Sequence, residues 1–270
     1  MATTATPATG IQATGTKGRF VWHELMTTDP KAAQTFYREV VGWNTSKMEG
    51  GEMEYDFWLA GDSPDSMIGG LMSMPPGAVE MGSPPAWTAY VEVPDADATV
   101  AQVVKLGGKV LMPAKSVDQA GRFAVLQDPQ GAVFAVITSA MPLQPETDPR
   151  PREFSWHELT TSDLSGAIQF YEQIFGWEKK SEFDMGEMGV YYMFGRDRFT
   201  YGGMMKKTPD GPGVYWLHYI RVTDTADAAV ERAKKAGGTL MVGPMEVPGG
   251  DRIAVLRDPQ GAAFAVHSKP

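Results

Sequence analysis

The chain has 270 residues, no cysteine, four histidines and a formal charge of −9 from 24 basic and 33 acidic residues. The lack of cysteine excludes disulfides, thiol nucleophiles and cysteine-ligated metal centres. The acidic balance disfavours nucleic-acid binding, which needs clustered Lys and Arg. No segment reaches the roughly 20 apolar residues of a membrane span. We therefore expect a cytoplasmic protein with neither nucleic-acid nor membrane partners.

The sequence repeats itself. The segment WHEL at 22–25 recurs at 156–159, and RFAVLQDPQG at 122–131 recurs as RIAVLRDPQG at 252–261. Between the copies, the proline-rich residues 140–152 disfavour both helix and strand pairing, which is typical of a linker. The predicted organisation is a flexible tail (1–18), a first module (19–139), the linker (140–152) and a second module (153–268).

The elements of the first module follow in chain order. Residues 20–27 have the apolar and aromatic content of a strand. Asp29 and Pro30 provide an N-cap and a first helical residue, and the helix ends at Gly42. Further strands are predicted at 55–60, 68–74 and 86–93, a helix at 96–106, and strands at 110–112, 123–127 and 133–138. The pattern predicts an α+β fold of two tandem modules, each with two βαβββ units that form a cupped mixed sheet with helices outside.

The repeated motifs resemble those of the vicinal-oxygen-chelate superfamily, which includes glyoxalase I, ring-cleaving dioxygenases and bleomycin-resistance proteins. The pattern D-x-x-x-A-x-x-F-Y-x-x-x-x-G-W occurs at 29–43 and again at 163–177, and each copy later carries a Gly-Gly helix stop and a D-P-x-G turn. The resemblance implies that the two modules pair to shape the cups. It does not fix one activity, because this scaffold serves several chemistries.

The resemblance also implies a divalent metal held by side chains on the first, middle and last strands of a module. The matching positions here are Trp22, Thr88, Ala135, Trp156, Leu217 and Ala265. None is a metal ligand. His23, His157 and His218 each lie one residue away, and strand alternation turns them from the cup. We predict no metal cofactor; His23 and His157 are the candidate ligands of a divalent metal if a bulge shifts the register.

Glu24 and Glu158 are the candidate catalytic residues, because a carboxyl group among aromatic rings has a raised pKa suited to general-base chemistry. Their alternative is a structural role, accepting backbone N–H bonds at a module seam. Simple alternation predicts that the ligand-binding residues are Trp22, Trp156, Thr88, Tyr90, Glu92, Tyr219 and Arg221. Arg122 and Arg252 recur in both copies, where they could reach an anionic substrate or form surface ion pairs.

Three functions remain open. The leading hypothesis is a glyoxalase-like monomer or homodimer that binds a small organic molecule in an aromatic-lined cup without the usual metal, with Glu-based acid/base chemistry. The second is a metal-dependent lyase or dioxygenase with a non-standard His/Glu ligand set. The third is a non-catalytic scaffold or protein-interaction module. The missing ligand set favours the first.

Overall fold

The computed structural model describes residues 16–49, 54–80, 82–209, 211 and 213–270. Residues 1–15 of the expected tail lie outside this range. Gly18, at the end of that tail, is held by two contacts: its N–H donates to the carbonyl of Glu92 at 2.8 Å, and its carbonyl accepts from Trp177 Nε1 at 2.7 Å. The start of the first module is therefore fixed to the second.

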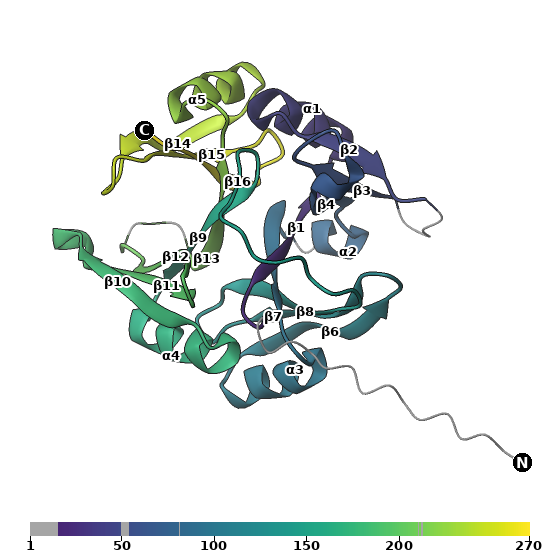
Figure 1. The fold of residues 1–270 in the computed structure, drawn as a ribbon, viewed down its shortest axis with the longest axis vertical. Coiled ribbons are helices and arrows are strands. Elements are labelled where there is room, and N and C mark those ends of the chain that lie inside the picture. The colour runs from purple at the N-terminus through teal and green to yellow at the C-terminus, as the bar shows by residue number, and fades with distance from the viewer. Residues whose placement is uncertain (1–15, 50–53, 81, 210, 212) are drawn as a thin grey trace, which may run out of the picture.

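The first module is an eight-stranded mixed sheet with the strand order β2-β3-β4-β1-β5-β8-β7-β6 (Figure 1). Its elements are β1 (Phe20–Thr27), α1 (Pro30–Val41), β2 (Asn44–Lys47), β3 (Tyr55–Leu59), η1 (Pro64–Ser66), β4 (Met67–Ser73), α2 (Pro76–Glu80), β5 (Ala86–Glu92), α3 (Ala96–Lys105), β6 (Lys109–Val117), β7 (Gly121–Gln127) and β8 (Val133–Ser139). The central strands β1 and β5 are antiparallel, and each has a parallel neighbour on its other side. Two βαβββ units thus join through their first strands.

The second module repeats this sheet in the order β10-β11-β12-β9-β13-β16-β15-β14. Its elements are β9 (Phe154–Thr161), α4 (Leu164–Phe175), β10 (Glu178–Asp184), η2 (Gly186–Met188), β11 (Val190–Arg196), β12 (Phe199–Lys206), β13 (Tyr215–Arg221), α5 (Ala226–Lys235), β14 (Thr239–Glu246), β15 (Arg252–Arg257) and β16 (Ala263–Ser268). The predicted α+β fold of two tandem modules, with four βαβββ units in all, is confirmed.

The first helix of each module begins and ends where the sequence predicts. The Asp29 side chain accepts the N–H of Ala32 at 3.0 Å, and Gly42 ends α1 with φ 79°, a left-handed conformation that glycine adopts without strain. Asp163 and Gly176 cap α4 in the same way. None of the helices in the described part of the chain has the length and apolar character needed to cross a membrane.

Two edge strands differ from the prediction. β2 was not predicted, because its four residues are polar and mostly exposed and show no alternation of apolar side chains. β6 is much longer than the predicted 110–112. It continues past Pro113 through two register shifts against β7, which accommodate a residue that cannot donate to the ladder.

The hydrophobic core is shared between the modules. One cluster joins the first half of module one, from α1, β4 and β5, to α5, β15 and β16 of module two. The other joins α3, β7 and β8 of module one to α4, β11 and β12 of module two. Figure 1 shows the same exchange: α1 lies beside α5, and α3 lies near α4. Each module therefore buries its apolar helices against the other.

Candidate functional site

Glu24 lies on the face of the first sheet that also carries Trp22 and Tyr90, here called the cup face. Its Oε2 accepts a hydrogen bond from the Tyr55 hydroxyl and its Oε1 accepts one from the Tyr90 hydroxyl, each at 3.0 Å. Trp22 Nε1 donates to the Tyr55 oxygen at 3.1 Å. Burial raises the pKa of Glu24, and the two phenols lower it by less than burial raises it.

Glu158 has the same surroundings in the second module. The Tyr191 hydroxyl donates to its Oε2 at 2.8 Å, and Trp156 Nε1 donates to the Tyr191 oxygen at 2.8 Å. Tyr219, which matches Tyr90, bonds the carboxyl group from β13. Burial again raises the pKa of the carboxyl group. The two cup faces therefore hold one arrangement twice: a carboxyl group between two phenols, one of them bonded to an indole.

Tyr55 and Tyr191 were missed by the sequence reasoning. The signal was present in the duplicated Gly-Gly pairs, because the second glycine of each pair lies under a tyrosine ring. A Cβ on Gly70 would overlap the Tyr55 hydroxyl, and a Cβ on Gly203 would overlap the Tyr191 ring. The glycines thus leave space for the phenols, but the sequence does not reveal what fills that space.

The remaining predicted ligand-binding residues fall into two groups. Thr88 pairs with Glu24 across β1 and β5 and shares its face of the sheet. Glu92 and Arg221 instead form hydrogen bonds within the fold. Glu92 accepts bonds from the backbone N–H and the hydroxyl of Ser139, and Arg221 donates to the carbonyl of Pro149 at 2.8 Å.

The repeated arginines form surface ion pairs. Arg122 binds Asp97 through two nitrogens, and Arg252 binds Asp227 in the same way at 2.8 and 2.9 Å. In each pair, the aspartate belongs to the first turn of the helix preceding the arginine's strand. Both arginines therefore anchor a helix to its sheet, which is the ion-pair alternative considered from the sequence.

The cup faces do not fit the metal that the superfamily resemblance implies. The three implied ligand positions of the first module, Trp22, Thr88 and Ala135, lie on β1, β5 and β8, and Tyr90 pairs with both Trp22 and Ala135. None of these three side chains is a metal ligand, and the neighbouring carboxyl group of Glu24 does not make a metal site by itself. Among the described residues, a group of three side chains that could together hold a metal ion does occur, but it does not lie on the cup face.

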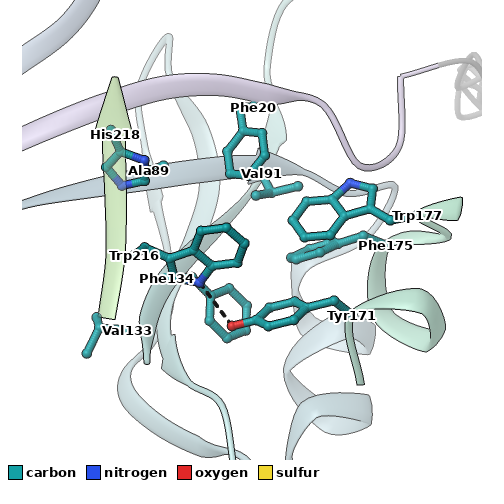
Figure 2. A pocket seen from close by; sticks show the side chains of 10 residues that line it. All are labelled: Phe20, Ala89, Val91, Val133, Phe134, Tyr171, Phe175, Trp177, Trp216 and His218. Atoms are coloured by element: carbon teal, nitrogen blue, oxygen red, sulfur yellow. Dashed lines mark hydrogen bonds between the residues drawn. The ribbon is translucent and has the colours of Figure 1, made fainter. Parts of the chain in front are cut away.

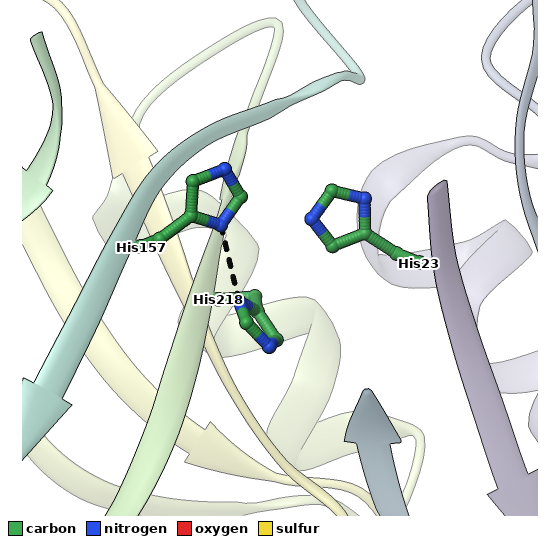
Figure 3. A group of neighbouring side chains, drawn as sticks. All are labelled: His23, His157 and His218. Carbon is green, nitrogen blue, oxygen red and sulfur yellow. Dashed lines mark hydrogen bonds between the residues drawn. The ribbon is translucent and has the colours of Figure 1, made fainter. Parts of the chain in front are cut away.

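That group consists of His23, His157 and His218, on the opposite face of β1, β9 and β13 (Figure 3). All three are buried between the modules, and their ligand atoms lie within 4.8 Å of one another. His23 stacks on Phe154 and His157 stacks on Phe20, each with 3.7 Å between ring centroids. Burial lowers the pKa of all three imidazoles, to about 3 for His218, so the neutral form dominates at pH 7.

Sequence reasoning found no third metal ligand to accompany His23 and His157, and the structure brings His218 close to both. His218 is the register partner of His157 across β13 and β9. This pairing is not visible in the sequence, where the residues are 61 positions apart. The matching position in the first module is Ala89, which pairs with His23. The cluster therefore departs from the internal symmetry of the chain.

A narrow crevice lies beside this cluster, between the modules. Figure 2 shows its ten lining residues, among them Phe20, Ala89, Trp216 and His218. The crevice does not admit a water molecule, so it is part of the core. A second hollow of about 200 Å³ is lined by residues of α1 and β2 and by Trp43. Neither is lined by Glu24 or Glu158, each of which is partly exposed on its strand.

Both modules match known protein families. Residues 154–266 match the Glyoxalase/Bleomycin resistance protein/Dioxygenase superfamily, and residues 22–137 match the Glyoxalase-like domain. A putative glyoxylase, CFP32 of Mycobacterium bovis, is 36% identical over 251 residues, covering 91% of this chain and 92% of its own. The anthracycline biosynthesis protein DauV of Streptomyces sp. strain C5 is 32% identical over 261 residues, covering 92% of each chain.

Solved structures share the fold at low identity. The 2,3-dioxygenase LapB from Pseudomonas sp. KL28 superposes with a TM-score of 0.66 at 12% identity, covering 94% of this chain and 93% of its own. The Mn(II)-bound glyoxalase from Novosphingobium aromaticivorans superposes with a TM-score of 0.58 at 15% identity, covering 94% of this chain and 82% of its own. At such identity the likeness shows the architecture alone.

Proposed function

Because the chain belongs to the Glyoxalase/Bleomycin resistance protein/Dioxygenase superfamily, we propose that it binds a small organic molecule over its cup faces. Glu24 and Glu158 act there as acid/base groups. The observation that carries this proposal is the carboxyl group held between two phenols, which occurs in both modules. Both glutamates are also partly exposed on their strands, where a donor group of a ligand can reach the carboxyl oxygens.

The chemistry follows from the hydrogen bonds. In the first module, each oxygen of Glu24 accepts one phenol O–H and keeps a lone pair for a donor on the ligand. A raised pKa brings the carboxyl group closer to neutrality at pH 7, so that it can take a proton from a bound ligand and return it. The two phenols hold the carboxyl group in place while this occurs.

The ligand we propose is planar and oxygenated. The ring of Trp22 contacts that of Phe57, and the ring of Tyr90, which binds Glu24, contacts that of Phe123. Such aromatic rings bury planar molecules well. Two relatives have anthracycline biosynthesis in their names, DauV of Streptomyces sp. strain C5 and DnrV of Streptomyces peucetius. An anthracycline, with its fused rings and hydroxyl and carbonyl groups, is therefore a suitable first probe.

The test is calorimetric titration of the probe into wild-type protein and into Glu24→Gln, Glu158→Gln and the double variant. A hydrogen bond to a charged group contributes about 1.5–3 kcal/mol. We therefore expect each single variant to weaken binding of the probe to the altered cup roughly tenfold to a hundredfold. Glu172→Gln is the matched control, because Glu172 also accepts a tyrosine hydroxyl, but at the surface of α4. A double variant that binds like wild type contradicts the proposal.

The same titration, repeated with a chelator and then with added Fe²⁺ or Mn²⁺, tests the second function, a metal-dependent lyase or dioxygenase. Several structural relatives have dioxygenase in their titles, and one glyoxalase is described as Mn(II)-bound. In this chain His23 and His157 lie on the face opposite Glu24 and Glu158, so they do not reach a ligand on the cup face. Binding that disappears with a chelator and returns with Fe²⁺ or Mn²⁺ would favour the metal-dependent function.

A further inference from the structure

Two nitrogen atoms of the buried histidine cluster are separated by nearly the distance expected between two ligands of one metal ion, and the third histidine lies close by. His157 Nδ1 and His218 Nδ1 are 3.1 Å apart. Two imidazole nitrogens on a tetrahedral zinc ion, each about 2.0–2.1 Å from the metal, are about 3.4 Å apart. Figure 3 shows the His23 ring pointing toward the other two rings.

The cluster leaves polar atoms without partners. His157 and His218 share one hydrogen bond, while Nε2 of His23 and Nε2 of His218 are buried and bonded to no protein atom. The three side chains are only 2–6% exposed. Buried nitrogen atoms of this kind are rare in proteins, and a bound ion is one explanation for Nε2 of His23. An ion held by Nδ1 of His218 leaves Nε2 of that ring without a protein partner.

We propose that His23, His157 and His218 form a metal site on the boundary between the modules, and that it takes a transition-metal ion that prefers imidazole, such as Zn²⁺. All three ligands are nitrogen atoms of neutral rings, and neutral imidazole suits zinc, copper and nickel. Calcium and magnesium prefer oxygen ligands, whereas all three candidate ligands here are imidazole nitrogens.

This site is distinct from the metal position that the superfamily resemblance implies, which lies on the cup face. His23 comes from β1 of the first module, while His157 and His218 come from β9 and β13 of the second. An ion bound to all three would therefore cross-link the modules. Because the first module has Ala89 in place of a second His218, the chain offers one such site rather than two.

The test is metal content and stability of the full chain. Protein is unfolded in chelator, refolded with excess Zn²⁺ or Co²⁺, freed of unbound ion and analysed for metal. Thermal unfolding and the visible Co²⁺ spectrum are recorded alongside. His218→Ala is the informative variant, because the fold already holds alanine at the matching position, Ala89. His267→Gln is the control, since His267 lies outside the cluster and binds Ser155 and Asp251.

We expect one ion per chain, a higher Tm with Zn²⁺ than with chelator, and a Co²⁺ spectrum typical of nitrogen ligands in low coordination. His218→Ala loses the ion and the Tm increase but remains folded, and His267→Gln keeps both. Refolded wild-type protein with no more metal than His218→Ala overturns the proposal. Stoichiometric metal that survives in His218→Ala overturns it as well.

Discussion

The Tyr37 hydroxyl donates a 3.2 Å hydrogen bond to the carboxylate of Asp258, in the other module. Trp87 Nε1 donates to the same phenol oxygen at 2.8 Å, so the hydroxyl links two buried polar groups. Tyr171 repeats the arrangement, donating to Asp128 at 3.0 Å and accepting from an indole. The tyrosine of the repeated F-Y motif and the aspartate of the repeated D-P-x-G turn therefore join the modules.

We expect Tyr37→Phe and Tyr171→Phe each to lower the free energy of unfolding by about 2 kcal/mol. Each change leaves a buried carboxylate oxygen and an indole N–H without the shared hydroxyl, and unsatisfied buried groups cost about 1–3 kcal/mol. Urea denaturation measures the loss. Tyr192→Phe is the control, because its hydroxyl binds only Glu172 near the surface. Equal losses of unfolding free energy in all three variants would show that the hydrogen bonds between the modules stabilise the fold no more than a hydrogen bond near the surface does.

These bonds show what the sequence could and could not predict. The F-Y and D-P-x-G motifs predicted the fold, since local patterns specify a capped helix and a tight turn. They did not predict their partners, because Tyr37 and Asp258 are 221 residues apart and no local pattern connects them. The modules exchange halves in the core, so contacts across the boundary depend on tertiary arrangement.

The cup faces show the same limit. The alternation of β1 predicted that Trp22 and Glu24 share a face, because side chains of a strand alternate with a period of two. Tyr55 lies on β3, and β4 separates that strand from β1. Glu24 is paired with Gly70 and Tyr55 with the neighbouring Met72, so the phenol reaches the carboxyl group across a glycine. Such a diagonal contact requires the register of three strands.

Gly70→Ala should displace Tyr55 and destabilise the fold by roughly 1–3 kcal/mol, the usual cost of overpacking. The added Cβ would overlap the phenol. Gly77→Ala in α2 is the matched control: nothing lies within 4 Å of its Cβ position, so we expect no loss. Combining Gly70→Ala with Tyr55→Ser should recover most of the stability. If the double variant is no more stable than Gly70→Ala, the clash with Tyr55 is not the cause.

Removing one phenol should raise the pKa of Glu24 further. The Tyr55 hydroxyl donates to the charged form of the carboxyl group and so lowers its pKa, while burial raises it. Tyr55→Phe removes the donor and leaves the ring in place. Carboxyl ¹³C chemical shifts, followed through a pH titration, should show Glu24 titrating at higher pH while Glu158 is unchanged. Tyr191→Phe should shift Glu158 alone. A downward shift in either variant would contradict the assigned role of the phenol.

The buried histidines should make the metal-free protein less stable as the pH falls below about 6.5. Burial lowers the pKa values of His23, His157 and His218 in the folded state, so the unfolded chain binds more protons in this range. The slope approaches about 1.4 kcal/mol per pH unit for each histidine. For His218 the loss continues until the pH reaches its folded-state value, about 3.

Glu24 and Glu158 act in the opposite direction, because their raised pKa values make the folded state bind the extra proton. Comparing variants separates the two effects. With chelator present, urea denaturation between pH 7 and 5 should give a shallower pH dependence for His218→Ala than for wild type. Val103→Ala also creates a cavity in the core but removes no titrating group, so it should lower stability equally at both pH values. The same slope in His218→Ala and wild type would show that His218 is not the source of the acid sensitivity.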